Sequence, residues 1–133
     1  MRHIVIASHH RFAAGLRDTL EFVGGELGII DISAYVDETP LDDQVEAVFS
    51  RFAPTDEVLV LTDMLQGSVN QAFRRYMSDH VFLVTGINLP CALELALCGG
   101  PLTADVVRQA IEDARQQLLL VNDQVVEIDE YDE

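Results

Sequence analysis

The chain has 133 residues, of which 49% are hydrophobic, and its 8 basic and 23 acidic side chains give a formal net charge of −15 at pH 7. This length and apolar content predict one compact domain with its own core. The negative charge repels nucleic-acid phosphates and anionic lipid surfaces, so we expect neither as a partner. The uninterrupted apolar stretches are shorter than the about 20 residues that cross a bilayer.

The N-terminus and the two cysteines indicate a cytoplasmic protein. The chain begins directly with a hydrophobic strand pattern, without the apolar segment and cleavage site of a secretion signal. Cys91 and Cys98 lie seven residues apart in one expected helix, too far for a disulfide, and they lack the CxxC spacing of a zinc site. We therefore expect reduced core thiols in a cytoplasmic protein. From about residue 129 the chain is strongly acidic, and we expect a solvated tail there.

Strand and helix patterns alternate along the chain. Short apolar or β-branched segments predict strands over residues 3–7, 28–32, 57–62, 81–84 and 125–128. Between them, apolar spacing and the positions of Pro40, Pro54 and Thr103 predict helices over residues 12–23, 40–53, 67–76, 91–97 and 103–119. Residues 58–61 are continuously apolar, as in a central strand covered on both faces. The alternation predicts an α/β fold with a single open, mostly parallel sheet flanked by helices.

Three loops are expected at the carboxyl edge of this sheet, where open α/β proteins bind their ligands. They comprise residues 8–11, 63–68 and 86–90, and the first two contain His9 and Asp63. A neutral imidazole with one free ring nitrogen is a nucleophile, and a carboxylate that accepts the other ring N–H fixes that tautomer. We therefore expect His9 to accept a phosphoryl group beside Asp63. Ser68 and the N–H groups of the following helix suit the phosphoryl oxygens, and no metal is needed.

Each of these residues also has an ordinary structural interpretation. A loop histidine is more often a surface or capping residue than a catalytic one, and we interpret His10 and His80 in that way. Asp63 alone could cap the next helix, and Ser68 could bond a neighbouring backbone N–H. Spacing alone therefore leaves the function open.

Three segments together resemble the mannose-family (mannose/fructose/sorbose) enzyme IIA components of the phosphotransferase system (PTS). Residues 4–9 and 12–16 are similar to the family's opening, which usually contains a Ser-or-Thr-His-Gly loop. Residues 58–63, followed by Gly67, Ser68 and Asn70, are similar to its second segment, normally Thr-Asp-x-x-Gly-Gly-Ser-Pro. Residues 86–90 are similar to its third segment, and all three occur in order within about residues 3–98.

The resemblance implies a cytoplasmic phosphocarrier, with residues 1–133 forming a single IIA-type domain. The phosphocarrier HPr would phosphorylate His9, a IIB domain would accept the group, and a membrane IIC/IID complex would then phosphorylate a sugar during import. Asp63 would orient the imidazole, while Gly67 and Ser68 would contact the phosphoryl group, without a cofactor. The family also implies a homodimer in which a last strand, here residues 125–128, pairs across the subunits.

The sequence departs from the family pattern at three positions that border the expected site. His10 and Gln66 replace glycines, and Val69 replaces the proline. Such glycines often provide a positive φ or allow a close backbone approach. His10 and Gln66 could therefore reshape the phosphate pocket or the contacts with a partner.

Three other functions compete with this interpretation. A regulatory phosphoprotein of the same fold would not pass its phosphoryl group to a IIB domain. A two-component receiver domain needs an acidic pair where Ser8 and His9 stand. A metal-dependent hydrolase would use His9, His10, Asp63 and His80, whose spacing matches no metal motif. None of these residues specifies which sugar is transported.

Overall fold

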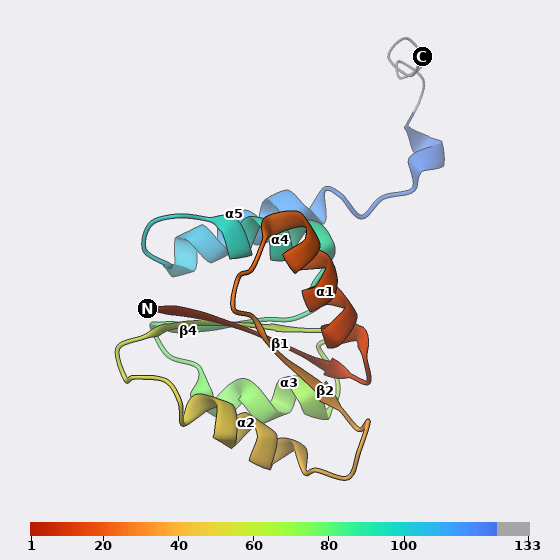
Figure 1. Cartoon of the computed structure of the whole chain (residues 1–133). Coiled ribbons are helices and arrows are strands. Elements are labelled where there is room, and N and C mark those ends of the chain that lie inside the picture. Colours follow the sequence, from red (N-terminus) through yellow and green to blue (C-terminus); the bar gives the residue numbers. More distant parts are fainter. Residues whose placement is uncertain (125–133) are drawn as a thin grey trace.

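The computed structural model describes residues 1–124, which form one four-stranded sheet between two layers of helices (Figure 1). The strands are β1 (Arg2–His9), β2 (Ile30–Ala34), β3 (Glu57–Thr62) and β4 (Val81–Val84). The helices are α1 (Phe12–Gly24), α2 (Leu41–Phe49), α3 (Ser68–Phe73), α4 (Leu89–Leu97) and α5 (Ala104–Arg115), with short 3₁₀ turns η1 (Arg74–Tyr76) and η2 (Val121–Asp123). The strands are parallel in the order β2-β1-β3-β4, which confirms the predicted fold class.

Each helical layer closes its own apolar core. Helices α1, α4 and α5 cover one face of the sheet, and α2 and α3 cover the other (Figure 1). Alternate residues of a strand point to opposite faces, so Ile4 and Ile6 enter the first core, whereas Val5 and Ala7 enter the second. The central strands β1 and β3 are covered on both sides, which explains their continuous apolar runs.

The strand order places the end of β1 at the point where the chain reverses its direction across the sheet. From β1 the chain moves to β2 on one side, and it then returns to β3 on the other side. The register pairs His9 with Ala34 and Ala7 with Thr62, so β1, β2 and β3 end at one edge, the carboxyl edge. In open α/β sheets this reversal point is where ligands bind.

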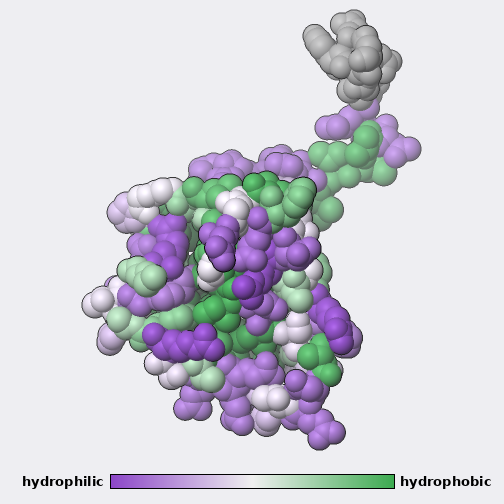
Figure 2. Space-filling view, in the orientation of Figure 1, coloured by the Kyte–Doolittle hydropathy of each residue, from purple (hydrophilic) through white to green (hydrophobic). Residues whose placement is uncertain are grey.

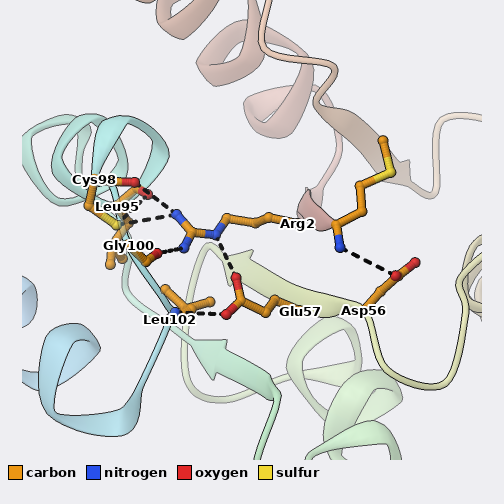
Figure 3. A network of polar contacts seen from close by, with 8 residues as sticks. Arg2, Asp56, Glu57, Leu95, Cys98, Gly100 and Leu102 are labelled. Carbon is orange, nitrogen blue, oxygen red and sulfur yellow. Dashed lines mark hydrogen bonds and ion pairs between the residues drawn. The ribbon is translucent and has the colours of Figure 1, made fainter.

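The opposite, amino edge is closed by polar contacts of Arg2 (Figure 3). The Arg2 guanidinium donates to a carboxylate oxygen of Glu57 at 3.1 Å and to the backbone carbonyls of Cys98 at 2.9 Å and Gly100 at 2.6 Å. The other Glu57 oxygen accepts the backbone N–H of Leu102 at 2.8 Å. These bonds, the Arg2–Glu57 clasp, tie the α4–α5 connection to β1 and β3.

Several boundaries differ from the sequence-based predictions, among them the helix predicted over residues 40–53, which runs from Leu41 to Phe49. The strand predicted over residues 28–32 runs from Ile30 to Ala34, because Gly28 has a left-handed φ of 67° that no strand accommodates. The helix predicted over residues 103–119 begins after its Thr103 cap but ends at Arg115. Beyond it, residues 118–121 are exposed and have no apolar surface to hold them in a helix. The loop expected to begin at residue 8 begins only after His9, which lies in β1.

Other predictions concern the cysteines and the C-terminus. Both cysteines are free; Cys91 is buried in α4, and Cys98 caps that helix instead of lying within it. The predicted strand over residues 125–128 and the acidic tail lie outside the described residues. Within residues 1–124, no helix has the length and apolar character needed to span a membrane.

Candidate functional site

His9 and Asp63 meet at the carboxyl edge, at the ends of the two central strands. His9 is the last residue of β1, and Asp63 directly follows β3. One carboxylate oxygen, Oδ2 of Asp63, accepts the backbone N–H of His9 at 2.9 Å and lies 3.0 Å from Nδ1 of the same residue. A carboxylate only accepts hydrogen bonds, so Nδ1 carries the proton and Nε2 keeps its lone pair. The contact selects the tautomer in which Nε2 is unprotonated.

The Asp63 carboxylate is held in its ionised form. Burial, the largest single influence, raises the pKa of Asp63, but the hydrogen bonds from the backbone and ring of His9 outweigh it and lower that pKa below its ordinary value. The Asp63 side chain is 15% exposed and the His9 side chain 36%. The pair therefore places a shielded negative charge behind an imidazole whose other side remains open.

Three buried polar residues hold the loops around this pair. Among residues 1–124, the buried polar side chains are Ser8, Thr62 and Asn70, and the sequence analysis assigned no role to them. The Ser8 hydroxyl accepts the backbone N–H of Ala13 at 2.7 Å and donates to the carbonyl of His10 at 2.9 Å. These bonds fix the start of α1 next to His9.

The loop between β3 and α3 is fixed by the other two buried side chains. The Thr62 hydroxyl donates to Oδ1 of Asn70 at 3.0 Å, and Nδ2 of Asn70 donates to the carbonyl of Leu65 at 3.3 Å. Buried polar groups that are fully hydrogen-bonded restrict a loop to one conformation. Asp63 and Gly67 therefore belong to one fixed loop.

Gly67 lies directly against the imidazole. It has a φ of 119°, and a Cβ at this position would lie 3.0 Å from Cε1 and 3.2 Å from Nε2 of His9. A side chain would therefore meet the ring at Cε1 and Nε2. Gly67 is also the N-cap residue of α3. Because glycine has no side chain, no side-chain oxygen accepts the first N–H groups of that helix.

Two residues with left-handed backbone flank His9. Among residues 1–124, the non-glycine residues with positive φ are His10 at 58° and Tyr35 at 69°, and the backbone N–H of His10 bonds the carbonyl of Ala34 at 2.8 Å. His10 stands where the family pattern has glycine, and the left-handed conformation explains that preference. The Tyr35 ring lies 5.8 Å from the His9 ring, and its hydroxyl is hydrogen-bonded to that of Ser68.

Tyr35 was missed by the sequence analysis. Its only sequence signal is its place after the second strand, whose end shares the carboxyl edge with the end of β1. A left-handed tyrosine has no local sequence signature, because turns of this kind normally contain Gly, Asn or Asp.

The third loop supports the site without reaching His9. The backbone N–H of Ile87 bonds the carbonyl of Thr62 at 3.1 Å, and Asn88 caps α4 by accepting the N–H of Cys91 at 2.9 Å. Of the residues that depart from the family pattern, Gln66 is exposed, and Val69 is buried in the core beneath α3.

The four residues considered for a metal site are not brought together. His80 precedes β4 at the amino edge, where its carbonyl accepts the backbone N–H of Val58 at 2.9 Å and its ring contacts Asp79 at 3.0 Å. His9 and Asp63 lie at the other end of the sheet. In the part of the chain that the structure describes, no three His, Cys, Asp or Glu side chains are grouped to hold a metal ion.

Comparison with known proteins identifies the family. Residues 3–113 match the EIIA-man family, described as the PTS system fructose IIA component. A candidate phosphoenolpyruvate-dependent sugar PTS permease from Klebsiella pneumoniae is 36% identical, with 94% of each chain covered and a TM-score of 0.87. A PTS IIA protein associated with the fucose utilization operon of Streptococcus pneumoniae is 27% identical, with 92% of this chain and 95% of that chain covered and a TM-score of 0.77.

A more distant structure shares the fold. The mannose/sorbose specific IIA subunit from Enterococcus faecalis is 19% identical and has a TM-score of 0.76, with 90% of this chain and 93% of that chain covered. Because the family match extends over most of the chain, and the Klebsiella protein is similar along nearly the full length of both chains, the assignment rests on sequence as well as fold. The chain belongs to the mannose-type IIA component family of the sugar phosphotransferase system.

Proposed function

We propose that this protein is a cytoplasmic phosphocarrier that accepts a phosphoryl group from HPr on Nε2 of His9 and passes it to a IIB domain. The observation that carries the proposal is the 3.0 Å contact between Nδ1 of His9 and Asp63, which leaves Nε2 as the free nucleophile. In this scheme residues 1–133 form one IIA-type domain. The membrane IIC/IID complex receives the phosphoryl group only indirectly, through the IIB domain.

The chemistry is an in-line transfer between two imidazole nitrogens. The Nε2 lone pair of His9 attacks phosphorus, the bond from phosphorus to the donor nitrogen breaks, and the donor imidazole leaves with that electron pair. The His9 ring gains positive charge as the new bond forms, and the Asp63 carboxylate stabilises it. We propose that the first N–H groups of α3, which no side chain caps, and the Ser68 hydroxyl contact the phosphoryl oxygens. Transfer to the IIB domain reverses these steps.

Exposed apolar side chains at the carboxyl edge support a protein as donor and acceptor. Phe12, Met64, Leu65 and Leu89 all follow strand ends at the carboxyl edge, and they are 48%, 49%, 63% and 37% exposed. A shallow groove of about 310 Å³ runs between Phe12 and Leu89. Clustered exposed apolar residues favour protein contact, and the open groove is unlike the enclosed pocket of a small substrate.

The proposal includes a homodimer in which residues 125–128 of one subunit pair with the sheet of the other. β4 is an edge strand of the four-stranded sheet, and an open edge is a template for a further strand. The chain that follows α5 extends away from the body of the domain (Figures 1 and 2), and it includes an exposed apolar segment, residues 118–121. Contact with a second subunit would bury this segment.

The central experiment follows one phosphoryl group by intact mass. The protein is mixed with phosphoenolpyruvate, enzyme I and HPr, and we expect one acid-labile phosphoryl group, which the His9→Ala variant lacks. The control is His80→Ala, which removes a histidine from the amino edge and should leave labelling intact. If His9→Ala were still labelled, the proposed acceptor would be wrong.

Onward transfer separates the proposal from a regulatory phosphoprotein of the same fold. A purified IIB domain from the same source is added to the labelled protein, and we expect the label to move to it. A label that stays on His9 in the presence of several IIB domains would favour the regulatory function.

A further inference from the structure

Tyr35 adopts a costly conformation that its packing does not explain. Its φ of 69° is unfavourable for a side chain with a Cβ, and 54% of the residue is exposed. Burial of its ring therefore offsets little of the cost. Residues with strained backbone conformations are concentrated at active sites and ligand-binding sites.

The surroundings of Tyr35 connect it to the candidate phosphoryl acceptor. Its ring lies 5.8 Å from the His9 ring with an interplanar angle of 38°, and its hydroxyl is hydrogen-bonded to the Ser68 hydroxyl. Ser68 follows Gly67, where an added Cβ would lie 3.2 Å from Nε2 of His9. Tyr35 directly follows β2 and Ser68 begins α3, so two separate segments meet next to the His9 ring.

We propose that Tyr35 is a positioning residue for phosphoryl transfer at His9. Its hydroxyl holds the Ser68 hydroxyl beside Nε2, and its ring shields one side of the imidazole from water. This inference rests on the proposed function, and it adds a residue to which the family pattern gave no role.

The Tyr35 hydroxyl keeps its contact with Ser68 during the reaction. Before transfer, the hydrogen bond between the two hydroxyls holds the Ser68 hydroxyl in one orientation. Once the phosphoryl group is bonded to Nε2, the Ser68 hydroxyl donates to a phosphoryl oxygen while the Tyr35 hydroxyl donates to the Ser68 oxygen, and no covalent bond to Tyr35 forms. Preoriented donors lower the cost of organising the transition state.

The left-handed backbone explains how Tyr35 reaches this position. β2 ends at Ala34, and Ala34 pairs with His9 across the sheet. The next side chain of a regular strand would continue along the sheet. The left-handed turn instead directs Tyr35 toward α3, where Ser68 accepts or donates the hydrogen bond.

The test separates the hydroxyl from the ring. Tyr35→Phe keeps the ring, so we expect a transfer rate from HPr about tenfold lower, the effect of one hydrogen bond, and an unchanged lifetime of the phosphohistidine. Tyr35→Leu removes both, so its phosphohistidine should also hydrolyse several-fold faster than that of the wild type. Both readouts come from quenched-flow transfer and from the decay of purified labelled protein.

A double-mutant cycle tests whether Tyr35 acts through Ser68. We expect Ser68→Ala to lower the transfer rate about tenfold. The Tyr35→Phe/Ser68→Ala protein should show no further loss, because both changes remove the same hydrogen bond between the two hydroxyls. The matched control is Tyr76→Phe, which removes a phenol hydroxyl at the amino edge, 2.9 Å from Arg75, and should transfer at the wild-type rate.

The outcomes distinguish this inference from the proposed function. If wild type is labelled on His9 but Tyr35→Phe transfers at the wild-type rate, the inference is wrong and the proposed function stands. A double variant about a hundredfold slower than wild type would show that the two hydroxyls act independently, and it would also overturn the inference. If His9→Ala is still labelled, both proposals fail.

Discussion

β1 carries a histidine–aspartate pair at each of its ends, and the two pairs differ in what surrounds them. At the amino edge, Nε2 of His3 lies 2.8 Å from Asp56, and at the carboxyl edge, Nδ1 of His9 lies 3.0 Å from Asp63. The aspartates are similarly shielded, with side chains 14% and 15% exposed. The hydrogen bond to the imidazole alone therefore does not distinguish a functional pair from a structural one.

The first pair is closed by its neighbours. The His3 ring stacks on Phe52 with centroids 4.0 Å apart, and Asp56 also accepts the backbone N–H of Ala53 at 3.0 Å. Its carboxylate lies 3.5 Å from the N-terminal amine of Met1. The hydrogen bond from His3, the largest cause, and the bond from Ala53 lower the pKa of Asp56. The contact between His3 and Asp56 joins β1 to the start of β3.

The second pair leaves one side of its imidazole open. The His9 side chain is 36% exposed, compared with 19% for His3, and the neighbour at its free nitrogen is a glycine. Two left-handed residues, His10 and Tyr35, lie beside it, whereas the amino edge has no non-glycine residue with positive φ among residues 1–124. An accessible nitrogen and stored strain are thus the features that separate the two edges.

The largest expected effect comes from changing the carboxylate of the open pair. Asp63→Asn removes the negative charge beside the imidazole and replaces one carboxylate oxygen by an N–H₂ group, so an acceptor for either Nδ1 of His9 or the backbone N–H of Met64 is lost. We expect phosphoryl transfer from HPr to His9 to fall by about 100-fold, as when a group that supports proton placement is lost. Quenched-flow measurements of labelled protein give this rate.

The closed pair provides the matched control for this change. Asp56→Asn alters the same kind of contact at the other end of β1, so we expect a small loss of stability and an unchanged transfer rate at a temperature where the variant is folded. If both substitutions slowed transfer equally, the proposed difference between the edges would be wrong. If neither did, Asp63 would not orient His9.

A smaller effect is expected from weakening the Arg2–Glu57 clasp. Glu57→Gln keeps an acceptor for Leu102 but turns an amide N–H₂ group toward Arg2, whose guanidinium then loses a partner. We expect the free energy of unfolding at pH 7 to fall by about 1–2 kcal/mol. Urea denaturation measures it, and the transfer rate of the folded variant should stay unchanged because the clasp lies at the amino edge.

The contribution of the Glu57 carboxylate to the free energy of unfolding depends on pH. The hydrogen bond from Leu102, the largest cause, together with the interactions with Arg2, lowers the pKa of Glu57 despite the opposing effect of burial. A lowered folded-state pKa stabilises the protein above the unfolded pKa of about 4.3, and this contribution is lost as the pH falls through the folded-state value. The difference between wild type and Glu57→Gln should therefore shrink below about pH 4.3. A difference that remained constant in acid would contradict an ionised clasp.

The sequence predicted the fold because its strongest patterns are local. The strands at residues 57–62 and 81–84 were predicted with the observed bounds, since continuous apolar runs between breakers leave little choice. The second strand was shifted by two residues because Gly28 has a left-handed φ that the apolar pattern does not reveal. The last helix was predicted too long because its end contains neither glycine nor proline, and the apolar residues beyond it are exposed.

The candidate site was only partly accessible to sequence reasoning. His9 and Asp63 could be placed together because parallel strands end at one edge. The contacts of Tyr35 depend on a left-handed backbone and on a partner 33 residues away, Ser68, and no local pattern encodes either. Likewise, no local pattern shows that the His9 side chain is more exposed than the His3 side chain.

The smallest expected effect is a gain in stability at the carboxyl edge. His10→Gly removes the Cβ from a residue with φ 58°, which relieves backbone strain of about 1–2 kcal/mol. The greater conformational freedom of glycine in the unfolded chain lowers the free energy of unfolding by about 0.5–1 kcal/mol. We expect a net gain of about 0.5 kcal/mol, or about 2 °C in Tm, by calorimetry. Gln116→Gly, an exposed position with φ −72°, should lower Tm instead, since no strain is relieved there. A lower Tm for His10→Gly would show that the His10 side chain makes contacts that outweigh its strain, and only Tyr35 would then remain as a residue held in a strained conformation for function.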